Sequence, residues 1–351
     1  MSILYHLTIP RPAHPALDAV VQEAMALQAQ FGGAVVYLNP TRRPGSRYPE
    51  RLYGLHRLPY LRRQEATIRL HHVYNPHLFY FPYLRWLRRP IIYSVTAGLR
   101  PQRPANLERL GRLAAIVVSN ERDLTTVRGW GLENAHVIQP GIDTSRSSPT
   151  PPPPGPGFRL LAGSAPWSAA QFHSKGIEAL LAAAEARTDL RLVCLWRGIL
   201  FEEMQARVAR SGLGERVEVI NRRVDVNAVL ARVHAAVVLA QEATLVKAFP
   251  HSLLEALAAG RPVLVSRALP MADYVERTGC GQVVETVSPE GVLEALERLA
   301  MNYDAHQATA LRVGRRDFSR KALMNEYERL YAEHGYFFRV SKTNQSGRKC
   351  R

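Results

Sequence analysis

The sequence has little cysteine and no long apolar run. Its 351 residues include only Cys194, Cys280 and Cys350, too few for a disulfide framework or a cysteine metal cluster, and this scarcity favours a reducing compartment. No apolar run reaches the roughly 18 residues that a membrane-spanning helix requires. The first residues also lack the basic and apolar segments of a secretory signal, so we expect a cytoplasmic protein.

Lysine is scarce as well, because 41 of the 46 basic residues are arginines, and they face 30 acidic residues for a net charge of +16. Residues 1–148 carry +10, residues 149–338 carry +1, and the last thirteen residues carry +5. Such an excess indicates an anionic partner, which is a membrane surface, a phosphorylated ligand or nucleic acid. No nucleic-acid reading module accompanies the charge, so we do not expect nucleic acid to be the partner.

The length and the pattern of apolar residues predict two α/β domains. A chain of 351 residues exceeds a single core of usual size. Short apolar runs alternate with helical patterns on both sides of a proline-rich stretch, which predicts parallel sheets covered by helices on both faces. We expect an N-terminal domain over 1–148, a linker over 149–157, a C-terminal domain over 158–316, a helix over 317–338 and a disordered basic tail over 339–351.

The most informative segment is 236–266, where a buried strand is followed by a loop and a helix. Pro250 suits the first turn of that helix, and Gly260 and Pro262 suit its end. Parallel sheets bind ligands at the carboxyl ends of their strands, and the N–H groups that open such a helix favour an anion such as a diphosphate. Glu255 on this helix could accept hydrogen bonds from both hydroxyls of a ribose.

The stretch FPHSLLEALAAGRPVLVS, residues 249–266, resembles the donor-site motif of glycosyltransferase family 4. That family comprises retaining, nucleotide-sugar-dependent enzymes with a GT-B fold, in which two Rossmann-like domains face a central cleft. Its motif contains two glutamates separated by seven residues. The second corresponds to Glu255, whereas Lys247 stands at the first.

Further segments resemble the family in the same order along the chain. They are Lys175-Gly176, the residues from Ile220 to Arg222, the sequence P-G-I-D at 140–143, and a final helix from Asp317 that returns to the N-terminal domain. The resemblance therefore covers nearly the whole chain. It implies that the C-terminal domain binds a nucleotide sugar and that the N-terminal domain faces the acceptor.

The resemblance implies a set of site residues. Lys175 and Lys247 are the catalytic candidates, because Lys175 would contact the donor diphosphate and Lys247 takes the place of the glutamate beside the donor sugar. The donor-binding candidates are Glu255, Lys175, Ala248, Phe249, Ser252, Leu253, Leu254, Gly163, Ser164, Arg197, Ile220, Asn221 and Arg222. No metal site and no cofactor are expected, since fixed cations could neutralise the diphosphate.

Besides Lys247, the departures from the family include two loops. The first loop, IPRPAHPALD, contains no glycine where the family commonly has a Gly-Gly pair that touches the donor phosphates. Gly163-Ser164 stands where the family often has glycine and arginine, and Arg197 could supply the missing charge.

An arginine-rich stretch, residues 41–64, contains tyrosines and leucines between its arginines. On a membrane surface, arginines would meet lipid phosphates while tyrosine and leucine enter the interface. The alternative is a solvated arginine-rich surface. The acceptor-side or membrane-side candidates are Arg42, Arg43, Arg47, Arg51, Tyr53, Arg57, Arg62 and Arg63.

The sequence therefore predicts a retaining, metal-independent glycosyltransferase that moves a sugar from a nucleotide sugar to a lipid-linked or saccharide acceptor, on the inner face of a membrane. One alternative is a catalytically inactive nucleotide-sugar-binding or scaffolding protein, because Lys247 and the glycine-free loop depart from the family. Another is a nucleotide-sugar epimerase, which would need acid–base carboxylates in the cleft. The sequence does not fix the base, sugar, acceptor, linkage or oligomeric state.

Overall fold

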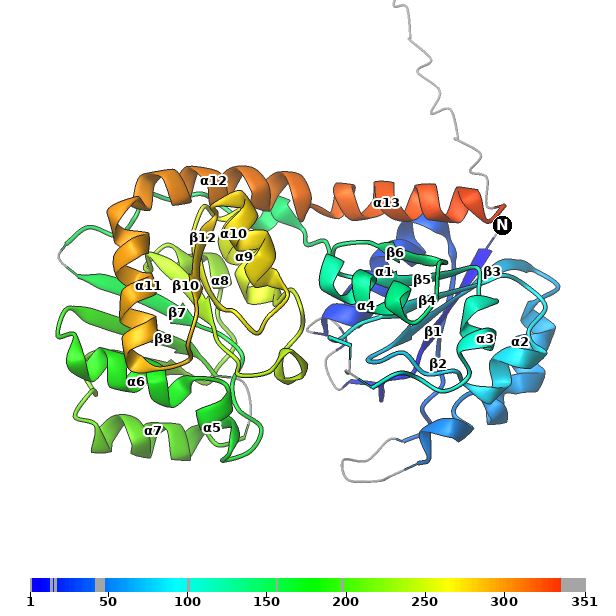
Figure 1. Cartoon of the computed structure of the whole chain (residues 1–351), viewed down its shortest axis with the longest axis horizontal. Helices are drawn as coiled ribbons and strands as arrows, with labels where there is room; N and C mark the ends of the chain where they lie inside the picture. The colour runs from blue at the N-terminus through cyan, green and yellow to red at the C-terminus, as the bar shows by residue number, and fades with distance from the viewer. Residues whose placement is uncertain are drawn as a thin grey trace, which may run out of the picture.

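The computed structural model describes residues 2–12, 15, 18–41, 48–99, 102–155, 157–196 and 199–335. These residues form two α/β halves, and two C-terminal helices run across both (Figure 1). Each half contains a six-stranded sheet in which all neighbouring strands are parallel. The predicted basic tail, 339–351, lies outside the described residues.

The N-terminal half contains a sheet with the strand order β2-β1-β3-β4-β5-β6. The strands are β1 Ser2–Leu7, β2 Gly33–Tyr37, β3 Ile68–Asn75, β4 Ile91–Val95, β5 Ala115–Val118 and β6 Ala135–Val137. The helices are α1 Ala19–Phe31, α2 Leu58–Gln64, α3 Leu107–Gly111 and α4 Glu121–Gly129. Every residue of β4 and β5 is buried, as expected for parallel strands with both faces covered.

The C-terminal half contains a sheet with the strand order β12-β11-β10-β7-β8-β9. The strands are β7 Phe158–Ala162, β8 Leu190–Leu195, β9 Val217–Ile220, β10 Ala235–Val238, β11 Val263–Ser266 and β12 Gly281–Val284. The helices are α5 Gln171–Ser174, α6 Ile177–Ala186, α7 Phe201–Arg210, α8 Val226–Leu230, α9 His251–Ala258, α10 Met271–Thr278 and α11 Pro289–Met301.

Each sheet has one point at which the strand order reverses. In the first sheet this point lies between β1 and β3, and in the second it lies between β7 and β10. The loops that leave the carboxyl ends of such neighbouring strands run in opposite directions and open a crevice, which is where open α/β sheets bind ligands. The fold therefore offers two crevices, one in each half.

The two C-terminal helices are α12, Tyr303–Asp317, and α13, Arg320–Glu333. The sequence predicted a helix that starts at Asp317, but Asp317 ends α12. The break has two causes: Ser319 caps α13, and the N–H of Ile142 donates to the carbonyl of Phe318 at 2.8 Å. The backbone also approaches closely here, since a Cβ on Gly141 would lie 2.9 Å from the Ser319 carbonyl oxygen.

Helix α13 packs on the N-terminal half through buried tyrosines. Its Tyr331 hydroxyl lies 2.7 Å from Nδ1 of His72, and the Tyr327 hydroxyl lies 3.1 Å from the Ser94 hydroxyl. His72 and His6 are both fully buried. The hydrogen bonds of His72 thus join the C-terminal helix to the first sheet.

Residues 149–155 of the predicted linker belong to neither a helix nor a strand. The fully buried Arg261 holds them, because its guanidinium donates to the hydroxyl of Thr150 and to the carbonyl of Pro151, while its Nε donates to the carbonyl of Leu230. Within the part of the chain that the structure describes, no helix is long and apolar enough to cross a membrane.

Candidate functional site

Four predicted donor-site residues lie together at the switch point of the second sheet. Gly163 and Ser164 follow β7, and Ser252 lies in the first turn of α9. A Cβ on Gly163 would lie 2.7 Å from the Ser252 hydroxyl oxygen, so the missing side chain allows the end of β7 to approach α9. The Lys175 ammonium lies 3.5 Å from the Ser164 hydroxyl and donates to the carbonyl of Ala165 at 3.2 Å.

Lys175 carries a buried positive charge. Its exposed fraction is 5%, and burial lowers its pKa. No carboxylate among the described residues offsets this shift. A buried charge without a counter-ion costs free energy, so the chemistry that completes this site is that of an anion.

The start of α9 favours the same chemistry. Pro250 precedes the helix, and no side chain caps the first turn. The first N–H groups and the positive end of the helix dipole therefore lie at the carboxyl end of β7, close to Lys175. A cation and an uncapped helix start together form a diphosphate-sized anion site.

The first loop of the N-terminal half, unlike the loop before α9, leads into a helix whose start is capped by a side chain. Oδ1 of Asp18 accepts hydrogen bonds from the N–H groups of Val20 at 2.9 Å and Val21 at 3.0 Å, so a carboxylate of the chain itself caps α1. The glycine-free loop thus places an acidic side chain where the family resemblance implies a phosphate contact. The start of α9, unlike that of α1, carries no such cap.

The other donor-side candidates lie around this cluster. Leu253 and Leu254 are fully buried in the core beneath α9, so any contact they make with a ligand would involve only their backbone. Glu255 is half-buried on α9. Ile220 is buried at the end of β9, and exposed Asn221 and Arg222 follow it at the same sheet edge. Arg197 lies outside the described residues.

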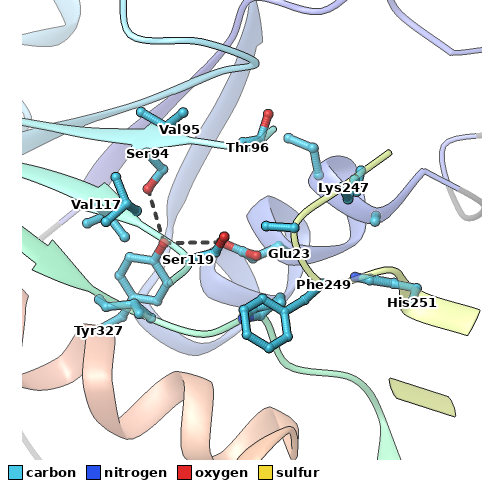
Figure 2. A pocket seen from close by; sticks show the side chains of 16 residues that line it. Glu23, Ser94, Val95, Thr96, Val117, Ser119, Lys247, Phe249, His251 and Tyr327 are labelled. Carbon is cyan, nitrogen blue, oxygen red and sulfur yellow. Dashed lines mark hydrogen bonds between the residues drawn. The ribbon is translucent and has the colours of Figure 1, made fainter. Parts of the chain in front are cut away.

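A cavity of about 60 Å³ lies between the two halves (Figure 2). The N-terminal half lines it with α1 and with the ends of β4 and β5, and the C-terminal half lines it with the loop before α9. The polar and charged groups that line it are Glu23, Ser94, Thr96, Ser119, Lys247, His251 and Tyr327. Two further donor candidates, Ala248 and Phe249, contribute apolar surface.

Opposite charges face this cavity from the two halves. Burial raises the pKa of Glu23, although a hydrogen bond from the Tyr327 hydroxyl at 3.1 Å and the charge of Lys247 oppose the shift. Burial lowers the pKa of Lys247, against the effect of Asp18 and Glu23. Burial and the Lys247 charge lower the pKa of His251 to about 4, so this imidazole is neutral at pH 7.

Lys247 thus stands where the family motif has a carboxylate, and Glu23 of the opposite half lines the same cavity. The sequence did not single out Glu23, Tyr327 or His251. Glu23 and Tyr327 resemble ordinary helix residues in their local patterns, and 304 positions separate them.

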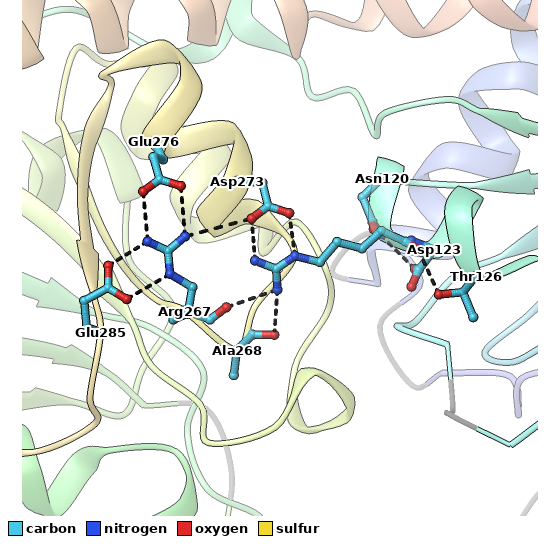
Figure 3. Close-up of polar contacts among 9 residues, drawn as sticks. Asn120, Asp123, Thr126, Arg267, Ala268, Asp273, Glu276 and Glu285 are labelled. Carbon is cyan, nitrogen blue, oxygen red and sulfur yellow. Dashed lines mark hydrogen bonds and ion pairs between the residues drawn. The ribbon is translucent and has the colours of Figure 1, made fainter. Parts of the chain in front are cut away.

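A second contact between the halves is formed by partly exposed charged side chains (Figure 3). The Arg122 guanidinium on α4 forms a two-pronged ion pair with Asp273 on α10 and donates to the carbonyl of Arg267 at 3.1 Å. Arg267 itself pairs with Glu276 and Glu285, at 2.9 and 2.6 Å. The ion pair lowers the pKa of Asp273.

The acceptor-side candidates are divided between the surface and the interior. Arg51, Arg57 and Arg63 are exposed. Arg62 instead lies 3.4 Å from Glu65 and donates to a backbone carbonyl of the N-terminal half, so it is part of the local structure. Tyr53 lines a pocket described below. Arg42, Arg43 and Arg47 lie outside the described residues.

Among the described residues, no group of three or more histidine, cysteine, aspartate or glutamate side chains is arranged to hold a metal ion.

Comparisons with known proteins show the fold and one family match. Residues 168–312, which include Lys175, Ser252 and Glu255, match the family model described as Glycosyl transferases group 1. A comparison with curated proteins finds no match.

Solved structures with a similar fold include HepE of Anabaena in complex with UDP, with 15% identity, a TM-score of 0.68, and coverage of 95% of this chain and 100% of that one. Sucrose-phosphate synthase from Thermosynechococcus elongatus has 16% identity, a TM-score of 0.70, and coverage of 95% and 99%. A glycosyltransferase from Rickettsia africae has 10% identity, a TM-score of 0.73, and coverage of 95% and 98%. The chain has the GT-B fold, with two parallel-sheet domains, as the sequence predicted.

Proposed function

We propose that the protein is a glycosyltransferase that binds a nucleotide sugar at the switch point of its second sheet. The observation that carries this proposal is the buried ammonium of Lys175, which has no carboxylate partner among the described residues and lies beside the uncapped start of α9. The group 1 family match covers this cluster. HepE, which shares the fold, has been solved with UDP and with UDP-glucose, which supports a nucleotide sugar as the donor.

In the proposed reaction the nucleoside diphosphate leaves as an anion while positive charge develops on the sugar ring. Lys175 and the N–H groups at the start of α9 stabilise the leaving group electrostatically. Glu255 accepts hydrogen bonds from the ribose, and the residues from Ile220 to Arg222 contact the base. The acceptor hydroxyl bonds to the anomeric carbon as the bond to the diphosphate breaks, and its proton passes to the leaving diphosphate. Transfer proceeds with retention of the anomeric configuration, without a metal and without a cofactor.

We also propose that a lipid-linked or saccharide acceptor approaches from the N-terminal half. The exposed arginines Arg51, Arg57 and Arg63 support an anionic membrane surface as a partner of this half. In this proposal the protein acts in the cytoplasm, on the inner face of the membrane.

The test is an assay of nucleotide release and sugar transfer with a panel of uridine-, adenosine- and guanosine-diphosphate sugars. NMR assigns the anomer of the released or transferred sugar, and parallel reactions with EDTA test metal independence. Glu255→Ala should abolish turnover, whereas Glu185→Ala, at an exposed position on α6, should not.

Three outcomes would count against the proposal. Tight nucleotide-sugar binding without turnover would favour the scaffolding alternative. Conversion of the donor sugar into its epimer would favour the epimerase alternative. Failure of every nucleotide sugar to bind would show that the proposed donor site does not bind a donor.

A further inference from the structure

A second pocket lies in the N-terminal half, at the switch point of the first sheet. Its volume is about 600 Å³, within the usual range for sites that bind small molecules. Thr8 and Pro10 follow β1, Asn39 follows β2, and His77 follows β3, so the pocket lies at the carboxyl edge of this sheet. Open α/β sheets bind ligands at this position.

The floor of the pocket is a fixed set of polar groups. Nε2 of His77 lies 3.1 Å from Glu50 Oε2, on the short 3-10 helix Glu50–Leu52. The Asn75 amide donates to the carbonyl of His77 at 2.6 Å and lies 3.4 Å from Glu50 Oε1, and the Thr8 hydroxyl bonds to Asn75. The side chains of His77 and Glu50 remain 25% and 33% exposed, so they are both anchored and accessible.

One wall of the pocket is aromatic. The rings of Tyr48 and Tyr53 are stacked, with their centroids 6.1 Å apart and an interplanar angle of 16°. Tyr53 also stacks on Phe81, and its hydroxyl accepts a hydrogen bond from Asn39 at 2.9 Å. An aromatic face packs against the C–H face of a sugar ring, while amides and carboxylates bind its hydroxyls.

Among the described residues, the lining of the pocket differs in charge from the domain around it. Residues 1–148 carry a net charge of +10, yet the described residues that line the pocket include the carboxylate of Glu50 and no lysine or arginine. A carboxylate repels a phosphate or an acidic sugar but accepts hydrogen bonds from hydroxyl groups. The chemistry of the lining therefore matches a neutral polyhydroxyl ligand.

We infer that this pocket binds a neutral saccharide and that the Glu50–His77 pair selects it against phosphorylated and acidic sugars. The role of this saccharide as the acceptor rests on the function proposed above. Glu50 accepts hydrogen bonds from the hydroxyls of one sugar unit, His77 donates to them, and Tyr48, which Tyr53 supports from behind, packs against the ring.

Saturation-transfer NMR and calorimetry on the full chain, with and without saturating UDP, test this inference. The probes are methyl α-glucoside, methyl α-galactoside, methyl α-mannoside and maltose, compared with glucose 6-phosphate and glucuronate. We expect at least one neutral probe to bind at least tenfold more tightly than the anionic probes. Glu50→Ala and His77→Ala should each weaken this binding at least tenfold and leave the UDP dissociation constant within twofold.

Two variants make the test independent of folding. Tyr53→Phe keeps the ring packing and removes only the hydroxyl that Asn39 contacts. Glu108→Gln changes an exposed carboxylate that pairs with Arg112 on α3, and serves as the matched control. Tyr53→Phe should weaken saccharide binding about threefold, and Glu108→Gln should not change it.

Preferential binding of anionic probes, neutral binding that Glu50→Ala leaves unchanged, or binding of none of the probes would each overturn the inference. UDP affinity and donor turnover are measured separately, so the two proposals fail independently. Loss of donor binding with saccharide binding intact would refute the proposed function and leave the saccharide site in place.

Discussion

Replacing Lys175 with methionine separates the cost of its buried charge from the role of that charge in binding. In the free protein, burial desolvates the Lys175 ammonium and lowers its pKa. The substitution removes this ammonium and its two hydrogen bonds, to Ser164 and Ala165. Each such bond contributes about 1 kcal/mol, and relief of the buried charge is of similar size and opposite sign. We therefore expect the free energy of unfolding to change by less than about 1 kcal/mol.

Catalysis should respond very differently. Removal of one preorganised contact to the developing charge of a leaving diphosphate costs about 2–4 kcal/mol of transition-state stabilisation. At about 1.4 kcal/mol for each factor of ten, kcat/KM should fall about 30- to 800-fold. The stabilisation that a nucleotide sugar gives to the folded state should also largely disappear.

Thermal unfolding with and without nucleotide sugar, together with donor-turnover kinetics, measures both effects. Lys321→Met is the matched control, because Lys321 is exposed on α13. An unchanged kcat/KM in Lys175→Met would show that the diphosphate binds elsewhere. A large loss of stability without ligand would show that Lys175 is a structural residue.

Three further outcomes follow from other parts of the structure. Arg122→Ala should lower the free energy of unfolding by roughly 1 kcal/mol, because it removes a half-exposed ion pair with Asp273 between the halves. Chemical denaturation should show a smaller loss of stability in 1 M NaCl, and an equal loss at high salt would contradict an ionic cause. Burial lowers the folded-state pKa of His71 to about 4 and that of His72 to about 3, so the unfolded chain binds more protons below pH 6.5. Stability should therefore be full above that pH and fall by about 2 kcal/mol per histidine between pH 7 and pH 5, and urea midpoints that do not change over this range would refute the assignment. Gly163→Ala should raise the KM for the nucleotide sugar several-fold, because its Cβ would collide with the Ser252 side chain in the first turn of α9. An unchanged KM would show that the close approach of β7 to Ser252 is not needed.

The elements that the sequence predicted carry their signals locally. The buried strands are short runs of valine, isoleucine and leucine, and α9 lies between Pro250 and the pair Gly260 and Pro262. The sequence did not predict α10 or α12. Helix α12 is polar overall, and the feature that fixes its position is a contact with α9, where a Cβ on Gly314 would lie 2.4 Å from a backbone carbon of Leu257. Such a contact between distant segments leaves no periodic pattern in the sequence.

The candidate site also contains both contacts that local sequence patterns predict and contacts that depend on distant segments. The sequence could predict Lys175, Gly163 and Ser252 as neighbours, since parallel strands bring the loops at their carboxyl ends to one sheet edge. It could not predict that Glu23 faces Lys247. That arrangement depends on how the two halves pack and on Tyr327, which reaches the cavity from the last helix.

This packing changes what is expected of Lys247→Glu, the substitution that would complete the family motif. The Lys247 side chain is largely buried beside α1, where Asp18 and Glu23 both raise its pKa against burial. A glutamate at this position would bring a third carboxylate to a small, poorly solvated cavity, and an uncompensated charge of this kind costs on the order of 3 kcal/mol. We therefore expect the variant to unfold at a lower temperature and the two halves to separate, with a larger radius of gyration in X-ray scattering and no gain in nucleotide-sugar turnover.

Two companion variants test whether the reversed charge causes the expected loss of stability. Lys247→Met removes the charge without reversing it and should lie between the wild type and Lys247→Glu in stability. Adding Glu23→Lys to Lys247→Glu restores a pair of opposite charges and should recover most of the lost unfolding temperature. If Lys247→Glu alone raised turnover and left the radius of gyration unchanged, the side chain at this position would serve the donor sugar and not the contact with α1. Because the charges that Lys247 meets come from the opposite half, the structure favours the contact.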